Sequence, residues 1–87
     1  MKSEQIQETV YNWAKNRKFT APYGVLTGNH SSPSGRKYRG VTFGFARTRD
    51  VEVRIYNRNF FVIRDSVLGI TMMKSFDLLM EYLNETY

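Results

Sequence analysis

Cysteine is absent from this chain of 87 residues, and histidine occurs once, at His30. Disulfides and thiolate zinc sites therefore cannot hold the fold, and a metal site built from several histidines is excluded. No apolar run approaches the roughly 18 residues of a membrane span, and the polar N-terminus does not have the pattern of a signal peptide. We expect a cytoplasmic protein that needs no metal, no cofactor and no membrane.

Acidic residues are absent from a long internal stretch of the chain. None occurs between Glu8 and Asp50, whereas the whole sequence has eight acidic and 13 basic residues and a net charge of +5. The basic residues of this stretch are Lys15, Arg17, Lys18, Arg36, Lys37, Arg39, Arg47 and Arg49. A region of one sign attracts polyanions or an acidic protein surface, which makes nucleic acid the first partner to consider.

Motifs for catalysis are scarce. Gly40 and Gly44 alternate with apolar residues as in a strand, and no helix start follows them to hold a phosphate, so they do not form a nucleotide-binding loop. Asp50 and Glu52 are separated by one residue, and a metal-dependent hydrolase would need them to converge with Asp65. We therefore expect a binding protein rather than an enzyme.

Two amphipathic helices are expected at the ends of the chain. Ser3 can cap a helix over residues 4–17, and Ser75 can cap a second helix in the C-terminal segment. Apolar residues at helical spacing form one stripe on each helix: Ile6, Val10, Trp13 and Ala14 on the first, and Phe76, Leu79, Met80 and Leu83 on the second. Each helix should therefore pack one side against a core.

Between the helices the apolar residues alternate as they do in strands. Pro22 excludes continuation of the first helix, and a segment rich in glycine and serine predicts a mobile loop over about residues 28–36. A tight turn is expected at Thr48, Arg49 and Asp50. The expected strands cover residues 23–27, 36–48, 51–57, 60–65 and 67–73.

These elements predict a single domain over residues 1–87 of the α+β class. An antiparallel meander of four to five strands should lie between the N-terminal and the C-terminal helix. Because both helices are amphipathic, they should pack on one face of the sheet and leave the other face open.

The turn at residues 57–59 decides which side chains point outward, because a shift of one residue reverses a whole strand. Asn57, Arg58 and Asn59 suit a three-residue hairpin loop, since Asn59 tolerates the left-handed conformation that such a loop needs. This register places Phe61 opposite Ile55, whereas a two-residue loop would expose Phe61. The expected core residues of the sheet are Val41, Phe43, Phe45, Val51, Val53, Ile55, Phe61 and Ile63.

The open face then carries arginines interleaved with aromatic rings. Phe60 should lie opposite Tyr56, and Arg64 opposite Glu52 as a favourable cross-strand pair. Guanidinium groups neutralise phosphates, and exposed rings stack on unpaired bases. The predicted contact residues are Arg36, Lys37, Tyr38, Arg39, Arg47, Arg49, Arg54, Tyr56, Arg58, Phe60 and Arg64. We therefore predict a non-catalytic module that binds RNA or single-stranded nucleic acid.

A protein target is the first alternative. The rings of Tyr56 and Phe60 and the arginines around them would serve equally in a protein interface, since tyrosine and arginine are enriched in binding hot spots. Small cysteine-free proteins of this kind are common among phage-encoded counter-defence factors. An antitoxin-like inhibitor of this type would act in the host cytoplasm on a nuclease, a toxin or another partner. An exposed edge strand could also pair with a second copy and give a homodimer.

A small ribonuclease is the second alternative. Such an enzyme needs an acid, a base and a cation at the phosphate, and His30, Tyr38 or Tyr56, and an arginine could supply them. The helix–sheet–helix order and the triplet Gly28-Asn29-His30 resemble the small toxin ribonucleases built on a fold like that of double-stranded-RNA-binding domains. The resemblance covers the topology and this one triplet.

Overall fold

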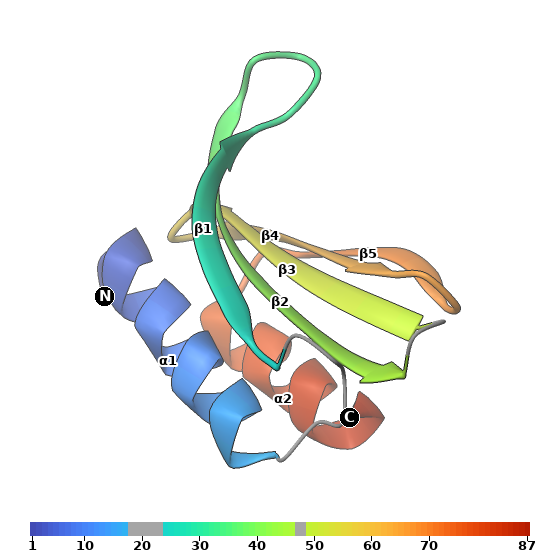
Figure 1. Ribbon diagram of the computed structural model, residues 1–87. Helices are drawn as coiled ribbons and strands as arrows, with labels where there is room; N and C mark the ends of the chain where they lie inside the picture. The colour runs from blue at the N-terminus through green and yellow to red at the C-terminus, as the bar shows by residue number, and fades with distance from the viewer. Residues whose placement is uncertain (18–23, 47–48) are drawn as a thin grey trace.

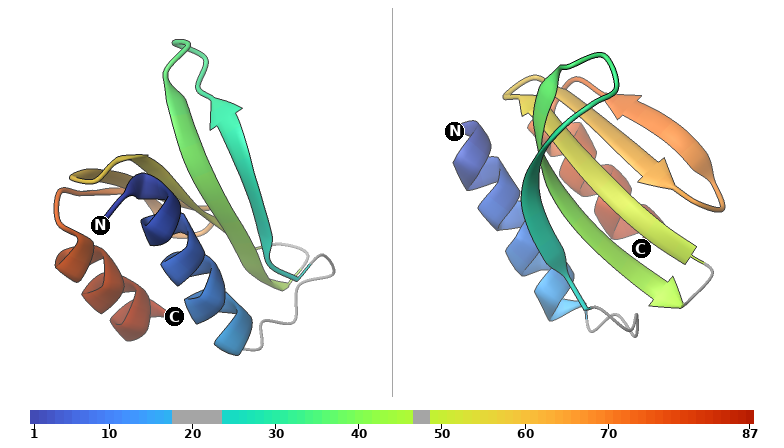
Figure 2. Two further views of the ribbon diagram at one scale, coloured as in Figure 1. Left: turned by 90° about the vertical axis from the view of Figure 1, so that its left-hand side faces the viewer. Right: turned by 45° about the horizontal axis from the view of Figure 1, so that its top comes forward.

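The computed structural model describes residues 1–17, 24–46 and 49–87, with Phe45 and Ala46 described by their backbone alone. In chain order the elements are α1 (Ser3–Asn16), β1 (Leu26–Ser31), β2 (Lys37–Ala46), β3 (Arg49–Asn57), β4 (Phe60–Asp65), β5 (Gly69–Met73) and α2 (Phe76–Thr86). Each strand pairs antiparallel with the next one in a five-stranded meander. Both helices lie on one side of the sheet (Figures 1 and 2), so the predicted α+β architecture is confirmed.

The core lies between the two helices and the inner face of the sheet. Its buried residues are Ile6, Val10, Ala14, Val41, Phe43, Val51, Val53, Ile55, Phe61, Ile63, Leu79 and Leu83. Trp13 packs at the margin of this core, with its ring 5.5 Å from that of Phe43, edge to face. Its indole Nε1–H donates to Asn84 Oδ1 at 3.0 Å, which ties α1 to α2. In the described part of the chain, no helix is long and apolar enough to cross a membrane.

Helix α1 begins one residue earlier than the sequence predicts. Ser3 lies inside the helix and Lys2 is its N-cap, so the prediction that Ser3 caps α1 is wrong. The Lys2 amide donates to Gln5 Oε1 at 2.8 Å, because the glutamine side chain of the first turn reaches back to this free amide. Helix α2 is capped as predicted, with Ser75 Oγ accepting from the Leu78 amide at 3.4 Å.

Strand β1 differs most from the prediction. It begins at Leu26 and runs through Gly28 to Ser31, so the predicted strand over residues 23–27 and the predicted loop over residues 28–36 both have the wrong extent. Gly28 pairs with Gly40 of β2, and the ladder continues through this pair of glycines. Pro22 and residue 23, the first residue of the predicted strand, lie outside the described residues.

The turn between β1 and β2 is short and closed by hydrogen bonds. The Ser32 amide donates to the Arg36 carbonyl and the Gly35 amide to the Ser32 carbonyl, both at 2.8 Å. Gly35 has a φ of 84°, a conformation that glycine adopts without steric cost. The hairpin therefore continues as a paired ribbon that rises above the rest of the sheet, away from the helices (Figure 1).

Strand β3 also begins earlier than predicted. Arg49 and Asp50 belong to the strand and pair with Ala46 and Gly44 of β2, so they are not part of a tight turn. Thr48, the third residue of the predicted turn, lies outside the described residues, as does Arg47. The pairing of β2 and β3 thus continues to this end of β3, with a shift of register between Gly44 and Ala46.

The register of β3 and β4 is the predicted one over most of its length. The pairs are Ile55 with Phe61, Val53 with Ile63 and Glu52 with Arg64. Near the turn the ladder is irregular, and Phe60 pairs with Asn57 rather than with Tyr56. The predicted pairing of Phe60 is wrong because Asn57 extends β3, where its Oδ1 accepts from the Asn59 amide at 2.7 Å. The core side and the outer side of β4 are nevertheless as predicted.

Strand β5 forms one edge of the sheet and is shorter than predicted. Residues 66–68 form the turn that precedes it, and the strand begins at Gly69. The alternating apolar residues Leu68, Ile70 and Met72 are 56–66% exposed, as is Val67 in the turn, so they contribute little to the core. They form an apolar strip along this edge.

Candidate nucleic-acid interface

The outer face of the sheet carries a row of rings across four strands. His30 of β1 pairs with Tyr38 of β2, and their ring centroids are 5.5 Å apart. Tyr38 and Tyr56 of β3 are 5.3 Å apart, and Tyr56 stacks on Phe60 of β4 at 5.5 Å with an interplanar angle of 29°. The four rings therefore form one continuous cluster, which we call the ring row.

Two glycines make room for the histidine of this row. A Cβ atom on Gly28 would lie 2.7 Å from Nε2 of His30, and one on Gly40 would lie 3.3 Å from its Cδ2. The imidazole thus rests against the backbone of β1 and β2, which is the close approach that a glycine inside a strand indicates. The Gly-x-His triplet is a visible sequence signal of this contact, although the sequence predicts it in a loop and the structure places it in β1.

Arg54 holds the centre of the outer face together. Its guanidinium lies 4.4 Å from the centroid of the Tyr38 ring. Its Nε donates to Glu52 Oε1 at 2.6 Å and its Nη1 to the Tyr56 hydroxyl at 3.4 Å. The Tyr38 hydroxyl in turn donates to Glu52 Oε2 at 3.4 Å. Burial, together with the neighbouring Glu52 carboxylate, raises the pKa of Tyr38.

Tyr38 and Arg54 are therefore supports of the surface more than contact points. Tyr38 is only 8% exposed, and the guanidinium of Arg54 lies over its ring. Glu52 lies opposite Arg64 as predicted, but its ion pair is with Arg54 along the same strand. The predicted Glu52–Arg64 ion pair is thus not formed.

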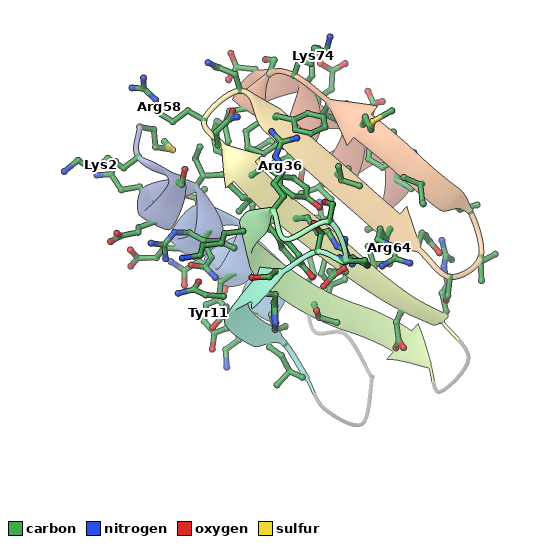
Figure 3. The ribbon with its side chains drawn as sticks, turned by 90° about the horizontal axis from the view of Figure 1, so that it is seen from above. Lys2, Tyr11, Arg36, Arg58, Arg64 and Lys74 are labelled. Atoms are coloured by element: carbon green, nitrogen blue, oxygen red, sulfur yellow. The ribbon has the colours of Figure 1, made fainter. Side chains whose placement is uncertain are left out.

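Among the described residues, Arg36 and Arg64 are exposed cations of the outer face. Arg36 comes from the β1–β2 turn, and its guanidinium lies 4.9 Å from the Tyr56 centroid and 5.1 Å from the Phe60 centroid. Figure 3 shows it lying over the middle of the sheet, with Arg64 over the neighbouring strands. The side chain of Arg64 makes no hydrogen bond or ion pair with the described residues. Both groups can therefore receive phosphates.

Other predicted contact residues lie elsewhere. Arg39 points to the helix side, where it pairs with Glu4 of α1 at 3.2 Å. Arg49 also points to the helix side and pairs with Asp65 at 3.0 Å. Lys37 lies two residues from Arg39 and shares its side of the hairpin. Arg58 is in the β3–β4 turn and points away from the sheet in Figure 3.

Asp65 is a buried anion, and the sequence suggests no role for it except that of a metal ligand. Its Oδ2 accepts from the Tyr87 hydroxyl at 2.7 Å and from Arg49 Nη2 at 3.0 Å. Its Oδ1 accepts from the amides of Val67 and Leu68 at 2.8 and 3.2 Å. Burial alone would raise the pKa of Asp65, but these hydrogen bonds outweigh it and hold this pKa well below its ordinary value. Burial and the Asp65 acceptor raise the pKa of Tyr87.

The structure brings together the types of group that the ribonuclease alternative needs: His30 contacts Tyr38, and Arg54 lies over the Tyr38 ring.

Within residues 1–17, 24–46 and 49–87, no group of three or more His, Asp or Glu side chains is placed to hold a metal ion. Comparisons of the chain with protein-family models, with curated proteins and with solved structures gave no match.

Proposed function

We propose that this protein binds single-stranded nucleic acid, RNA above all, across the outer face of its sheet. The observation that carries the proposal is Arg36, whose guanidinium lies over both Tyr56 and Phe60 on the face of the sheet opposite α1 and α2. A guanidinium plane over aromatic rings offers a stacking surface and a phosphate-binding charge in one group. Single strands expose both their bases and their phosphates, so they match this combination.

The charges of the outer face support an anionic ligand. The carboxylate nearest the ring row, that of Glu52, is already bound by Arg54 and by the Tyr38 hydroxyl. Arg36 and Arg64 are therefore left with their charge available to a ligand. The preformed network under the rings also means that binding does not have to order Tyr38, Arg54 or Tyr56, whose rings and hydrogen bonds are in place.

A salt titration tests the proposal. For single strands the slope of log K against log salt is about −0.7 per neutralised phosphate. The double variant Arg36→Gln/Arg64→Gln should therefore make this slope shallower by about 1.4, measured by fluorescence anisotropy of a labelled 12-nucleotide RNA. Lys2→Gln/Lys15→Gln removes the same charge from exposed positions at the N-cap and in the last turn of α1 and should leave the slope unchanged.

Two results would overturn the proposal: no binding to RNA or to single-stranded DNA at low salt, or the same slope for both double variants. The integrity of the RNA is followed in the same samples. Cleavage that disappears in His30→Ala would indicate a ribonuclease in place of a binding protein, since histidine is the side chain that most often transfers protons in catalysis and His30 belongs to the ring row.

A protein partner is a second candidate, favoured by the apolar strip along β5. Val67, Leu68, Ile70 and Met72 are large apolar side chains with more than half of their surface exposed. Such contiguous exposure at a free sheet edge is typical of a docking surface. We expect Ile70→Ser/Met72→Ser to abolish a nuclease-resistant complex with a host protein. Size-exclusion chromatography with light scattering of the purified protein shows whether the partner is instead a second copy.

A further inference from the structure

The hairpin of β1 and β2 has a second side, which faces α1. A cavity of about 520 Å³ lies between this side and the start of α1, near the ends of β2 and β3. Its volume is within the range of about 300 to 1,000 Å³ that small-molecule sites occupy. Lys37 and Arg39 line it, and none of its lining residues is acidic. The two views of Figure 2 show how the hairpin stands away from the helices here.

Strand register brings four polar side chains together on this side. Asn29 pairs with Arg39, and Ser31 pairs with Lys37. Residues two apart on one strand share a face, and directly paired residues have Cβ atoms about 4.5 to 5.5 Å apart. Ammonium, guanidinium, amide and hydroxyl groups therefore form a compact block in which each member can donate a hydrogen bond. We call these four residues the donor block.

The two cations of the donor block differ in their partners. The Arg39 guanidinium is held by Glu4 at 3.2 Å and by Asn29 Oδ1 at 3.4 Å, so its position is set by the fold. Lys37 is exposed and makes no hydrogen bond or ion pair with the described residues. The side chain of Glu4 is 73% exposed, and an exposed ion pair of this kind contributes little to stability. A phosphate can therefore displace the Glu4 carboxylate and bind both cations.

We infer that the donor block binds a phosphate group of the nucleic-acid chain. The inference rests on the proposed function: a strand that lies on the ring row continues around the edge formed by β1 and places one phosphate in this cavity. His30 and Tyr56 of the ring row line the same cavity, so the two sites are contiguous. A phosphate suits the block because it accepts several hydrogen bonds at once and compensates both charges.

The test uses the full chain labelled with ¹⁵N, in separate titrations with inorganic phosphate and with a 12-nucleotide RNA at constant ionic strength. Phosphate should shift the amide signals of residues 29–31 and 37–39. The variant Lys37→Gln should weaken RNA binding roughly tenfold, as expected for the loss of one hydrogen bond to a charged group. The matched control is Lys74→Gln, an exposed lysine at the end of β5, which should retain the affinity of the unmodified protein.

The outcomes separate this inference from the proposed function. RNA that binds with signal changes on the outer face alone, and with equal affinity for Lys37→Gln, overturns the inference and leaves the proposed function in place. Phosphate binding at the donor block without any RNA binding supports an oxyanion site and overturns the proposed function. Absence of signal changes with both ligands overturns both.

Discussion

Replacement of Asp65 by asparagine is expected to lower the free energy of unfolding by about 3 kcal/mol at pH 7, since removal of one partner from a buried ion pair costs about 3 to 5 kcal/mol. The side chain of Asp65 is 1% exposed, whereas that of Arg49 is 30% exposed, so water partly compensates the arginine and the lower end of this range applies. An asparagine amide group would also bring a donor to a position where the carboxylate accepts hydrogen bonds from donors alone.

The effect of this substitution should depend on pH. Because the pKa of Asp65 is lowered in the folded protein, its contribution is fully present above the ordinary aspartate value of about 3.9 and is lost as the pH falls further. The difference between the two proteins should therefore shrink by about 1.4 kcal/mol per pH unit below pH 4, because asparagine does not titrate there. For Tyr87 the pH dependence is opposite. Because its pKa is raised in the folded protein, its contribution to stability is fully present below the ordinary tyrosine value of about 10 and is lost as the pH rises further.

Urea unfolding followed by the fluorescence of Trp13, the single tryptophan, measures these differences. The control is Asp50→Asn, which changes an exposed carboxylate on the neighbouring strand and should alter the stability by less than about 0.5 kcal/mol. Equal stabilities of Asp65→Asn and the unmodified protein at pH 7 would contradict the expectation. So would a difference that stays constant between pH 7 and pH 2.

The strands β3 and β4 could be predicted from the sequence because their apolar residues alternate without interruption. Only one face of β3 can point to the core, because its apolar residues Val51, Val53 and Ile55 all lie on that face. The short polar turn after Asn57 then restricts the register of β4, so that Phe61 pairs with Ile55. The pairing of Phe60 could not be predicted in the same way. It depends on one extra residue in β3, and such an irregularity is decided by turn geometry rather than by hydrophobic pattern.

The extent of β1 could not be predicted because glycine has two opposite uses. The sequence predicts that Gly28 ends a strand, as glycine often does, but Gly28 pairs with Gly40 and accommodates the ring of His30. Only the position of His30 in three dimensions distinguishes the two uses. The short turn at residues 32–36 follows from this extension of the strand.

The side on which each arginine lies was partly readable. Arg39 has the same parity along β2 as Val41, and Arg49 has the same parity along β3 as Val51, so alternation places both on the helix side. Their acidic partners, Glu4 and Asp65, come from distant parts of the chain and had no sequence signal. The choice of Glu52 between Arg54 and Arg64 depends on rotamers, which the residue pattern does not determine.

Substitutions of the adjacent residues Phe60 and Phe61 should affect protein stability and RNA binding to different extents. Phe61 is fully buried between Ile55 and Met73 of the neighbouring strands, and Phe61→Ala should lower the free energy of unfolding by about 3 to 5 kcal/mol because it leaves a cavity. Phe60→Ala should cost only about 1 kcal/mol, since Phe60 lies on the outer face and loses the contacts with Tyr56 and Arg36.

The effects on RNA binding should have the opposite order. Removal of the Phe60 ring takes away a stacking surface and the platform of Arg36, so Phe60→Ala should weaken binding by about 1 to 3 kcal/mol, or roughly five- to more than a hundredfold. Phe61→Ala should retain the affinity under conditions where it is still folded, as verified by its Trp13 fluorescence. Urea unfolding and anisotropy titrations of the two variants, run side by side, give both quantities. A destabilisation larger for Phe60→Ala would refute the register of β4. Unchanged RNA affinity of Phe60→Ala would refute the role of the ring row in RNA binding. The comparison is informative because Phe60 and Phe61 are both phenylalanines of β4 and differ chiefly in the face of the sheet on which they lie.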